Sequence, residues 1–147
     1  MKRIYLDVCT ISRPFDDQND VQIRLETDAY MLILKAVQRK QYAMIISPAH
    51  IHEIAANSNI VERLELEALI AAYGTTPAYD LKAVRERAEY LFTRKFGIAD
   101  AAHAAFAEKS ADAFISCDRR LVRQCARLPL AIPAMDPVEF YTKETIA

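Results

Sequence analysis

Glycine is scarce in this sequence, with 2 residues among 147. The dinucleotide-binding fingerprint and the Walker phosphate loop both need several glycines in one short segment, so the scarcity argues against both. The three cysteines are odd in number and form no CxxC pair. This usage argues against a disulfide framework or a zinc knuckle, and it predicts a reduced, cytoplasmic protein.

A dominant charge and a long apolar run are also missing. The 19 basic and 20 acidic side chains give a net charge of -1, which excludes a dominant polybasic surface but is compatible with a local basic patch beside an acidic pocket. No stretch approaches the ~20 apolar residues of a membrane helix. The first residues hold too short an apolar run for a signal peptide. We therefore expect no membrane segment.

The composition that remains is that of a globular domain. Hydrophobic residues make up 52% of the chain and charged residues 27%, as in folded rather than disordered proteins. A typical domain has ~100–200 residues, and no repeat, low-complexity tract or linker divides this chain. We predict one domain spanning residues 1–147.

Short apolar segments alternate with segments of helical spacing. Strands are predicted at 2–8, 42–46, 113–116 and 130–132. Helices are predicted over 21–40, 48–57, 60–73, 79–96, 101–107, 118–128 and from 137 onward. The 21–40 helix should be largely buried, and residues 74–77 should form a turn between two helices able to pair as a hairpin. The alternation predicts an α/β fold, a three-layer α/β/α domain with a short-stranded parallel sheet.

Four acidic residues from distant segments are expected at one edge of this sheet. Asp7 ends the first strand, and Asp118 follows the 113–116 strand. Glu53 lies one to two turns into the helix after the second strand, and Asp100 opens a helix leading back toward the same edge. The carboxyl ends of parallel strands line a crevice, so these side chains are predicted to converge.

Such a cluster calls for a cation. Carboxylates at close range repel one another, and oxygen ligands select Mg²⁺ or Mn²⁺ over zinc. Metals of this kind suit phosphodiester chemistry, because they activate water and stabilise the attacking and leaving oxygens. Taken singly, Asp100 and Asp118 also fit as ordinary helix N-caps and Glu53 as a solvated residue. Asp7 is harder to dismiss, because a charge ending an apolar strand needs a partner.

The motifs around these acids resemble the PIN-domain family of metal-dependent nucleases over nearly the whole chain. The family's pattern is a hydrophobic strand ending in an acid, a helical glutamate, an aspartate opening an alanine-rich helix, and a last acid preceded two residues earlier by serine or threonine. Here these are Ile4–Asp7, Ile46–Ile54, Gly97–His103 and Ala111–Leu121. The ending, Ile132–Phe140, is similar to the family's last strand and closing helix.

The resemblance implies an endoribonuclease in which Asp7, Glu53, Asp100 and Asp118 are catalytic and hold Mg²⁺ or Mn²⁺. It also implies that Ser116 steadies the cluster, and that the products carry a 5′ phosphate and a 3′ hydroxyl. Small single-domain bacterial members look like VapC-like toxins of type II toxin-antitoxin pairs. The implied partners are therefore an RNA substrate, a cognate antitoxin protein and a second copy of the chain in a homodimer.

The chain departs from the family where many members follow the first acid with a small polar residue and an asparagine. Val8 and Cys9 stand there instead, and Thr10 and Ser12 are the nearest hydroxyls. The alternative interpretation is therefore a catalytically weak or silent PIN-fold module that binds RNA or protein.

A basic stripe follows the last acid. Arg119, Arg123 and Arg127 recur every four residues, opposite an apolar face. We hypothesise that the stripe holds the RNA backbone, because guanidinium pairs well with phosphate; a solvated basic face is the ordinary alternative. Arg13 is a weaker RNA-binding candidate, since it equally fits a pair with Asp16 or Asp17.

The three histidines, His50, His52 and His103, lack the spacing of a zinc-binding HExxH helix. We therefore expect them in structural or surface roles. Cys9 is expected to be a buried apolar side chain rather than a soft metal ligand.

Overall fold

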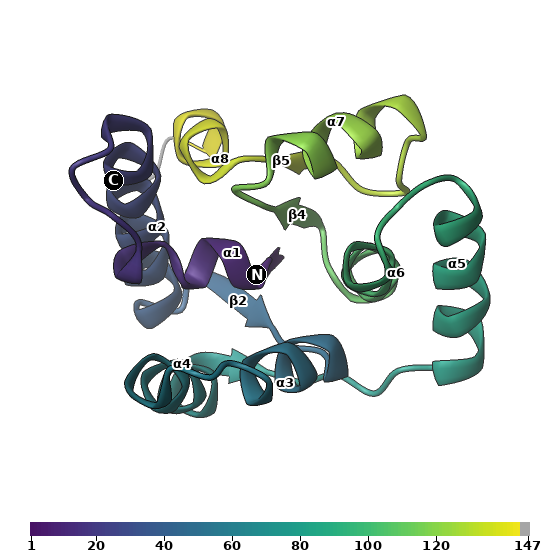
Figure 1. Ribbon diagram of the computed structural model, residues 1–147, viewed down its shortest axis with the longest axis horizontal. Helices are drawn as coiled ribbons and strands as arrows, with labels where there is room; N and C mark the ends of the chain where they lie inside the picture. The colour runs from purple at the N-terminus through teal and green to yellow at the C-terminus, as the bar shows by residue number, and fades with distance from the viewer. Residues whose placement is uncertain (145–147) are drawn as a thin grey trace.

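The computed structural model describes residues 1–144, and a parallel sheet lies at its centre (Figure 1). The strands within these residues are β1 (Lys2–Leu6), β2 (Tyr42–Ile45), β3 (Gly74–Thr75), β4 (Ala113–Ile115) and β5 (Ala134–Met135). All neighbouring pairs are parallel, and the order across the sheet is β3-β2-β1-β4-β5. The predicted short-stranded parallel sheet is confirmed.

Helices cover both faces of this sheet. They are α1 (Val8–Ile11), α2 (Val21–Gln38), α3 (Pro48–Ala55), α4 (Ile60–Tyr73), α5 (Leu81–Thr93), α6 (Ile98–Ser110), α7 (Arg119–Arg127) and α8 (Pro137–Glu144), with a 3₁₀ turn, η1 (Arg13–Phe15). Ser47 and Asn59 cap α3 and α4, and Pro48 occupies the first position of α3.

Alternation along β1 divides the core into two layers. Ile4 and Leu6 face a cluster formed with α1, α2, α4 and α8. Tyr5 faces the opposite cluster, formed with α5, α6 and α7. This follows from the two-residue period of a strand. The alanines of α6 allow it to lie close to the sheet, and the result is the predicted three-layer α/β/α fold, consistent with a PIN-like domain.

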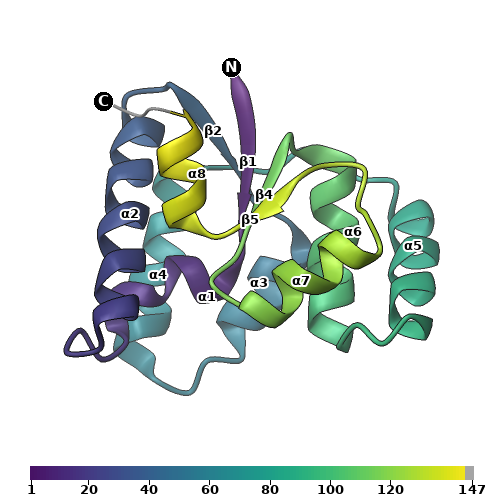
Figure 2. The same cartoon turned by 90° about the horizontal axis from the view of Figure 1, so that it is seen from above.

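The strand order creates a switch point between β1 and β4. From β1 the chain adds β2 and β3 on one side, and from β4 it adds β5 on the other. In open α/β sheets, ligands bind at the carboxyl ends of the strands beside such a point. Figure 2 shows α1, α3 and α7 gathered near these ends.

Two predictions at the sheet edges are wrong. The last strand lies at Ala134–Met135 rather than at 130–132. Proline has no N–H to donate to a neighbouring strand, and pairing with β4 starts only at Pro133, whose carbonyl accepts from the N–H of Phe114. The predicted turn at residues 74–77 begins with β3, which pairs with Met44 and Ile45.

The helical predictions also need correction. α5 packs against α6 instead of forming a hairpin with α4, and Figures 1 and 2 both place α4 and α5 at opposite sides of the molecule. The predicted burial of the 21–40 helix is wrong for Leu25, Met31 and Leu32, which are 51%, 45% and 37% exposed. Only one face of α2 meets the sheet and α8, so its other apolar residues face outward.

In α4, Leu66 is 2% exposed and Leu64 is 54% exposed. We expect Leu66→Ala to lower the free energy of unfolding by about 2–5 kcal/mol, because it leaves a cavity in the core. Leu64→Ala should change it by less than about 0.5 kcal/mol. Urea unfolding of the two variants checks this, and equal losses would contradict the assignment of the buried face.

Candidate metal centre

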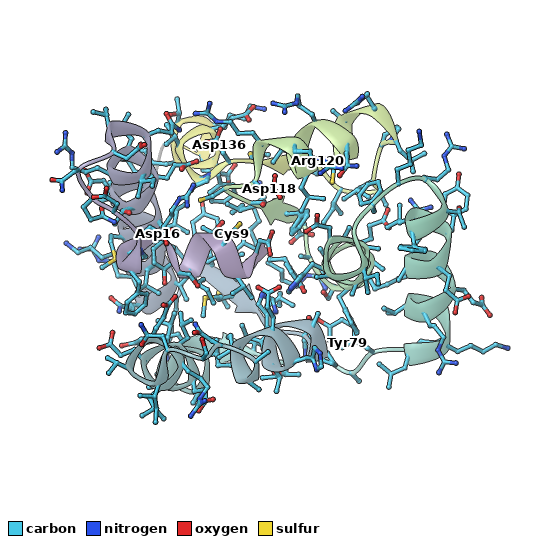
Figure 3. All side chains as sticks on the ribbon, viewed as in Figure 1. Cys9, Asp16, Tyr79, Asp118, Arg120 and Asp136 are labelled. Carbon is cyan, nitrogen blue, oxygen red and sulfur yellow. The ribbon has the colours of Figure 1, made fainter. Side chains whose placement is uncertain are left out.

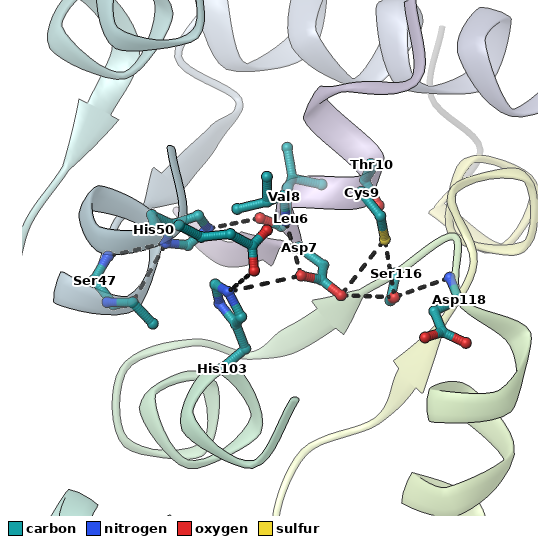
Figure 4. A network of polar contacts seen from close by, with 12 residues as sticks. Leu6, Asp7, Val8, Cys9, Thr10, Ser47, His50, His103, Ser116 and Asp118 are labelled. Carbon is teal, nitrogen blue, oxygen red and sulfur yellow. Dashed lines mark hydrogen bonds and ion pairs between the residues drawn. The ribbon is translucent and has the colours of Figure 1, made fainter. Parts of the chain in front are cut away.

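Asp7 lies at the switch point with its carboxylate buried. It directly follows β1 and is 5% exposed. Its Oδ1 accepts from the backbone N–H of Val8 at 2.8 Å, and its Oδ2 accepts from the hydroxyl of Ser116 at 2.9 Å and from the thiol of Cys9 at 3.5 Å (Figure 4). The buried charge is thus held by donors from α1 and from the end of β4.

Glu53 and His103 complete a compact group with Asp7. Glu53 lies on α3 and His103 on α6. The Nε2 atom of His103 is 3.2 Å from Oε1 of Glu53 and 3.9 Å from Oδ1 of Asp7. One ligand atom from each residue lies within 4.8 Å of the others, so this group could hold a metal ion.

Asp100 lies on the same side of the site but does not open its helix as predicted. α6 begins at Ile98 with Gly97 as N-cap, and the carbonyl of Gly97 accepts from the N–H of Ala101. Asp100 is therefore free of a capping role. Burial, then the charges of Asp7 and Asp118, raise the pKa of Asp100 to about 6.

Asp118 serves as the N-cap of α7, as its ordinary interpretation predicts. Its Oδ1 accepts from the N–H of Leu121 at 3.2 Å, and its own N–H donates to the hydroxyl of Ser116 at 3.1 Å. Figure 3 shows Asp118 near Cys9 in the middle of the molecule. Because Ser116 also donates to Asp7, one hydroxyl links the two acids.

Of the four acids named from the sequence, Asp7 and Glu53 join the compact group with His103, and Asp100 and Asp118 interact with this group through their charges. Asp7 and Glu53 share His103, and the charges of Asp7, Glu53 and Asp118 all act on Asp100. Burial raises the pKa of Asp7, although His103 and the bond from Ser116 oppose the shift. The positive charge that the protein places near these carboxylates does not fully offset their negative charge. A bound cation would reduce the repulsion between them.

His103 has a direct part in this centre that its sequence position did not indicate. Burial alone lowers the pKa of its imidazole, but the bond to Glu53 and the charges of Asp7, Glu53 and Asp100 outweigh it, so the pKa of His103 is raised. The expectation of a structural or surface role is thus incomplete. Its spacing of three residues from Asp100 on one helix was the available signal.

A chain of buried hydrogen bonds extends from His103 away from the acids. Its Nδ1 is 2.6 Å from the hydroxyl of Tyr5, which is 2.7 Å from the hydroxyl of Ser47. The backbone N–H of Ser47 donates to Nδ1 of His50, so Nε2 of His50 carries the proton and donates to the carbonyl of Leu6 at 2.7 Å.

This arrangement keeps His50 neutral. Burial, reinforced by His103, lowers the pKa of His50 to about 3, and its two ring nitrogens have fixed partners. His50 thus has the structural role expected from the sequence. The chain of bonds holds the ring of His103 in the orientation in which Nε2 faces Glu53.

The hydroxyl next to Asp7 comes from Ser116, which donates to Oδ2 at 2.9 Å. Thr10 directs its hydroxyl to the carbonyl of Ile115 at 3.4 Å instead. Cys9 is partly exposed rather than fully buried, and its thiol touches both Asp7 and Ser116.

The basic candidates fall into two groups. Arg119, Arg123 and Arg127 are exposed on α7, while its opposite face is buried, so the predicted two-sided helix is confirmed. Arg13 instead pairs with Asp16 at 2.9 Å and with the buried Glu26 at 3.0 Å. Both acids hold its guanidinium away from a role as a free phosphate ligand.

Comparison of the chain with protein-family profiles, curated proteins and solved structures finds no match. Any functional assignment therefore depends on the geometry of the site itself. Among residues 1–144, no helix combines the length and the apolar content needed to cross a bilayer.

The raised pKa of Asp100 predicts a pH-dependent effect on stability. A carboxyl whose pKa is raised by folding favours the fold below pH 4 and loses that contribution as the pH rises through about 6. In EDTA at pH 7.5, Asp100→Asn should therefore be more stable than the unaltered chain, by on the order of 1 kcal/mol after allowance for the partial exposure of Asp100. The difference should vanish below pH 4.

The same substitution at Asp112 is the matched control. Its bond from the N–H of Arg3 lowers the pKa of Asp112, so its contribution is present at neutral pH and is lost as the pH falls. Asp112→Asn should therefore destabilise the protein at pH 7.5. Thermal unfolding from pH 4 to 8 measures both, and a destabilised Asp100→Asn variant at pH 7.5 would contradict the electrostatic account.

Proposed function

We propose that the protein is a PIN-like endoribonuclease that hydrolyses RNA phosphodiester bonds with the help of Mg²⁺ or Mn²⁺. The observation that carries the proposal is the compact group of Asp7, Glu53 and His103 at the switch point of a parallel sheet, where the charges of Asp7, Glu53 and Asp118 also act on Asp100. Perturbed carboxylates of this kind are more frequent at functional sites than elsewhere.

The donor set fits a hard divalent cation. The proton on Nε2 of His103 points to Glu53, so the donors left for a cation are carboxylate oxygens, and such a set favours Mg²⁺ or Mn²⁺. Asp7 and Glu53 would be direct ligands, with Asp100 and Asp118 completing the site directly or through water. A cation bound there lowers the pKa of a water molecule and stabilises charge on the phosphate.

The protein's own side chains would position this chemistry. The N–H of His103 donates to Glu53 and orients its carboxylate, while the hydroxyl of Ser116 fixes Asp7 relative to the start of α7. Arg119 directly follows Asp118, Arg123 lies one turn further along α7, and both are exposed. Their guanidinium groups would pair with RNA phosphates next to the cleaved bond.

We further propose that the enzyme is the toxin of a type II toxin-antitoxin pair and forms a homodimer. Support comes from apolar side chains that are 45–62% exposed on α2 and α4: Val21, Leu25, Met31, Ile60, Val61 and Leu64. Exposed apolar groups at such density are typical of surfaces that a partner protein covers. The antitoxin or the second copy would bury them.

The contact between Cys9 and Asp7 favours a second candidate function. A thiol is a weak donor, and here it stands beside the central carboxylate at 3.5 Å. In this alternative the chain is a catalytically weak or silent module that binds RNA or protein. Metal dependence separates the two functions.

Purified protein should cleave a mixed structured RNA in Mn²⁺ or Mg²⁺ and leave it intact in EDTA. Asp7→Asn should lower the rate by at least about 100-fold, beyond the 10–100-fold typical of residues that only orient metal ligands. Gel analysis of the products measures this. Cleavage that survives EDTA or Asp7→Asn would refute the metal-dependent mechanism.

Metal binding can be read without activity. Mn²⁺ at about 100 times its dissociation constant should stabilise the fold by about 2.7 kcal/mol, and Asp7→Asn should remove most of that gain. Asp112→Asn, whose carboxylate lies outside the cluster, should keep it. Metal-induced stabilisation without cleavage of any RNA would favour the silent module.

The toxin role predicts a growth phenotype. Induced expression of the unaltered chain should slow growth of a bacterial host, and expression of Asp7→Asn at the same level should not, because it lacks the nuclease. Colony counts with immunoblotting measure this. Equal growth of the two strains would contradict a nuclease toxin.

A further inference from the structure

A hollow of about 210 Å³ lies between the α5–α6 loop and the C-terminal half of α7. We call it the phosphate hollow; it is lined by Arg94, Lys95, Phe96, Gln124, Arg127 and Leu128. Three of these side chains are cationic, and within residues 1–144 none of the three belongs to an ion pair. The complementary ligand is therefore an anion.

The walls of the hollow are fixed to each other. The amide of Gln124 on α7 donates to the carbonyl of Lys95 at 3.0 Å. Lys95 has a left-handed backbone, with φ of 72°, and closes α5 through bonds from Lys95 to Phe92 and from Phe96 to Leu91. The three cationic groups are thus attached to a defined backbone.

Both walls lead directly to acids of the metal centre. α7 starts after Asp118 and ends at Arg127, and the loop continues into α6, whose first turn carries Asp100. Arg119 and Arg123 lie between, so exposed cations follow α7 for roughly 12 Å at 1.5 Å per residue. A strand with its phosphate at the acids can follow this path into the hollow.

We propose that the phosphate hollow binds one nucleotide of an RNA strand, away from the bond that is cleaved. The proposal rests on the proposed function, which supplies RNA as the ligand. Guanidinium groups at Arg94 and Arg127 match a phosphate in geometry and charge. The volume is below the roughly 300–1,000 Å³ of pockets for free small molecules, and the partly exposed Leu128 provides apolar surface for the sugar or base.

The chain contains a matched control for this site. α2 also ends in an Arg-Lys pair, with Arg39 as C-cap and Lys40 in a left-handed backbone with φ of 62°. Bonds from Lys40 to Val37 and from Gln41 to Ala36 repeat the arrangement at the end of α5. This pair precedes β2, at the opposite edge of the sheet from the acids.

The test compares Arg94→Gln/Lys95→Gly with Arg39→Gln/Lys40→Gly. Each removes two charges at equivalent helix positions, and glycine suits the left-handed backbone, so neither should lower the melting temperature. Binding of a labelled single-stranded RNA of about 12 nucleotides, within the span of single-strand sites, is measured in EDTA over a range of salt concentrations. EDTA prevents metal-dependent cleavage during the measurement.

The variant in the hollow should bind more weakly, and its slope of log affinity against log salt should fall by about 0.7 for each phosphate that the protein no longer neutralises. The control should keep the slope of the unaltered chain. Equal slopes for all three proteins, or equal losses in both variants, would overturn the hollow as a subsite.

Cleavage in Mn²⁺ separates this outcome from the proposed function. If the unaltered chain cleaves RNA but the hollow variant keeps the same slope of log affinity against log salt, the subsite alone is refuted. If the slope falls only in the hollow variant and the unaltered chain never cleaves RNA, the subsite is supported and the nuclease function is refuted. A chain that binds no RNA refutes both.

Discussion

The buried charge of Asp7 is the constraint on which the arrangement of the site depends. A carboxylate that is 5% exposed at the end of the central strand is costly unless donors reach it. Those donors come from α1, which follows Asp7 directly, and from the end of β4, the strand beside β1. The parallel register that pairs Leu6 with Ile115 brings Ser116 beside Asp7, so the sheet itself sets the hydroxyl's position.

The bonds on the other side of β1 follow from the same strand. Tyr5, Leu6 and Asp7 are consecutive, and each contacts the network: Tyr5 holds His103, Leu6 accepts from His50, and Asp7 lies 3.9 Å from His103. A buried polar network with every member satisfied is rigid. The ring of His103 is therefore oriented by the fold before any cation binds.

The sheet and the positions of Asp7 and Asp118 could be predicted because the ends of apolar strands can be recognised in a sequence. Asp7 and Asp118 follow apolar strands, and parallel pairing then places them at one edge. The contacts of His103 could not be predicted in this way, because its partners Tyr5 and Glu53 are 98 and 50 residues away in the sequence. The buried face of α2 was mispredicted for another reason: apolar residues occur around most of the helix, so periodicity does not tell which face the sheet covers.

The structure also shows how Val8 and Cys9, the two residues that differ from the PIN-domain pattern, affect the bonding of Asp7. The side chain of Val8 packs into the core, and only its backbone N–H reaches Asp7, a bond that any residue other than proline supplies. The short hydroxyl bond to Asp7 comes from Ser116, at 2.9 Å. At Cys9, by contrast, the group beside Asp7 is a thiol, which is a weaker hydrogen-bond donor than the asparagine side chain of the PIN-domain pattern. A loss of activity caused by this departure would come from Cys9, since Val8 leaves the bonding of Asp7 intact.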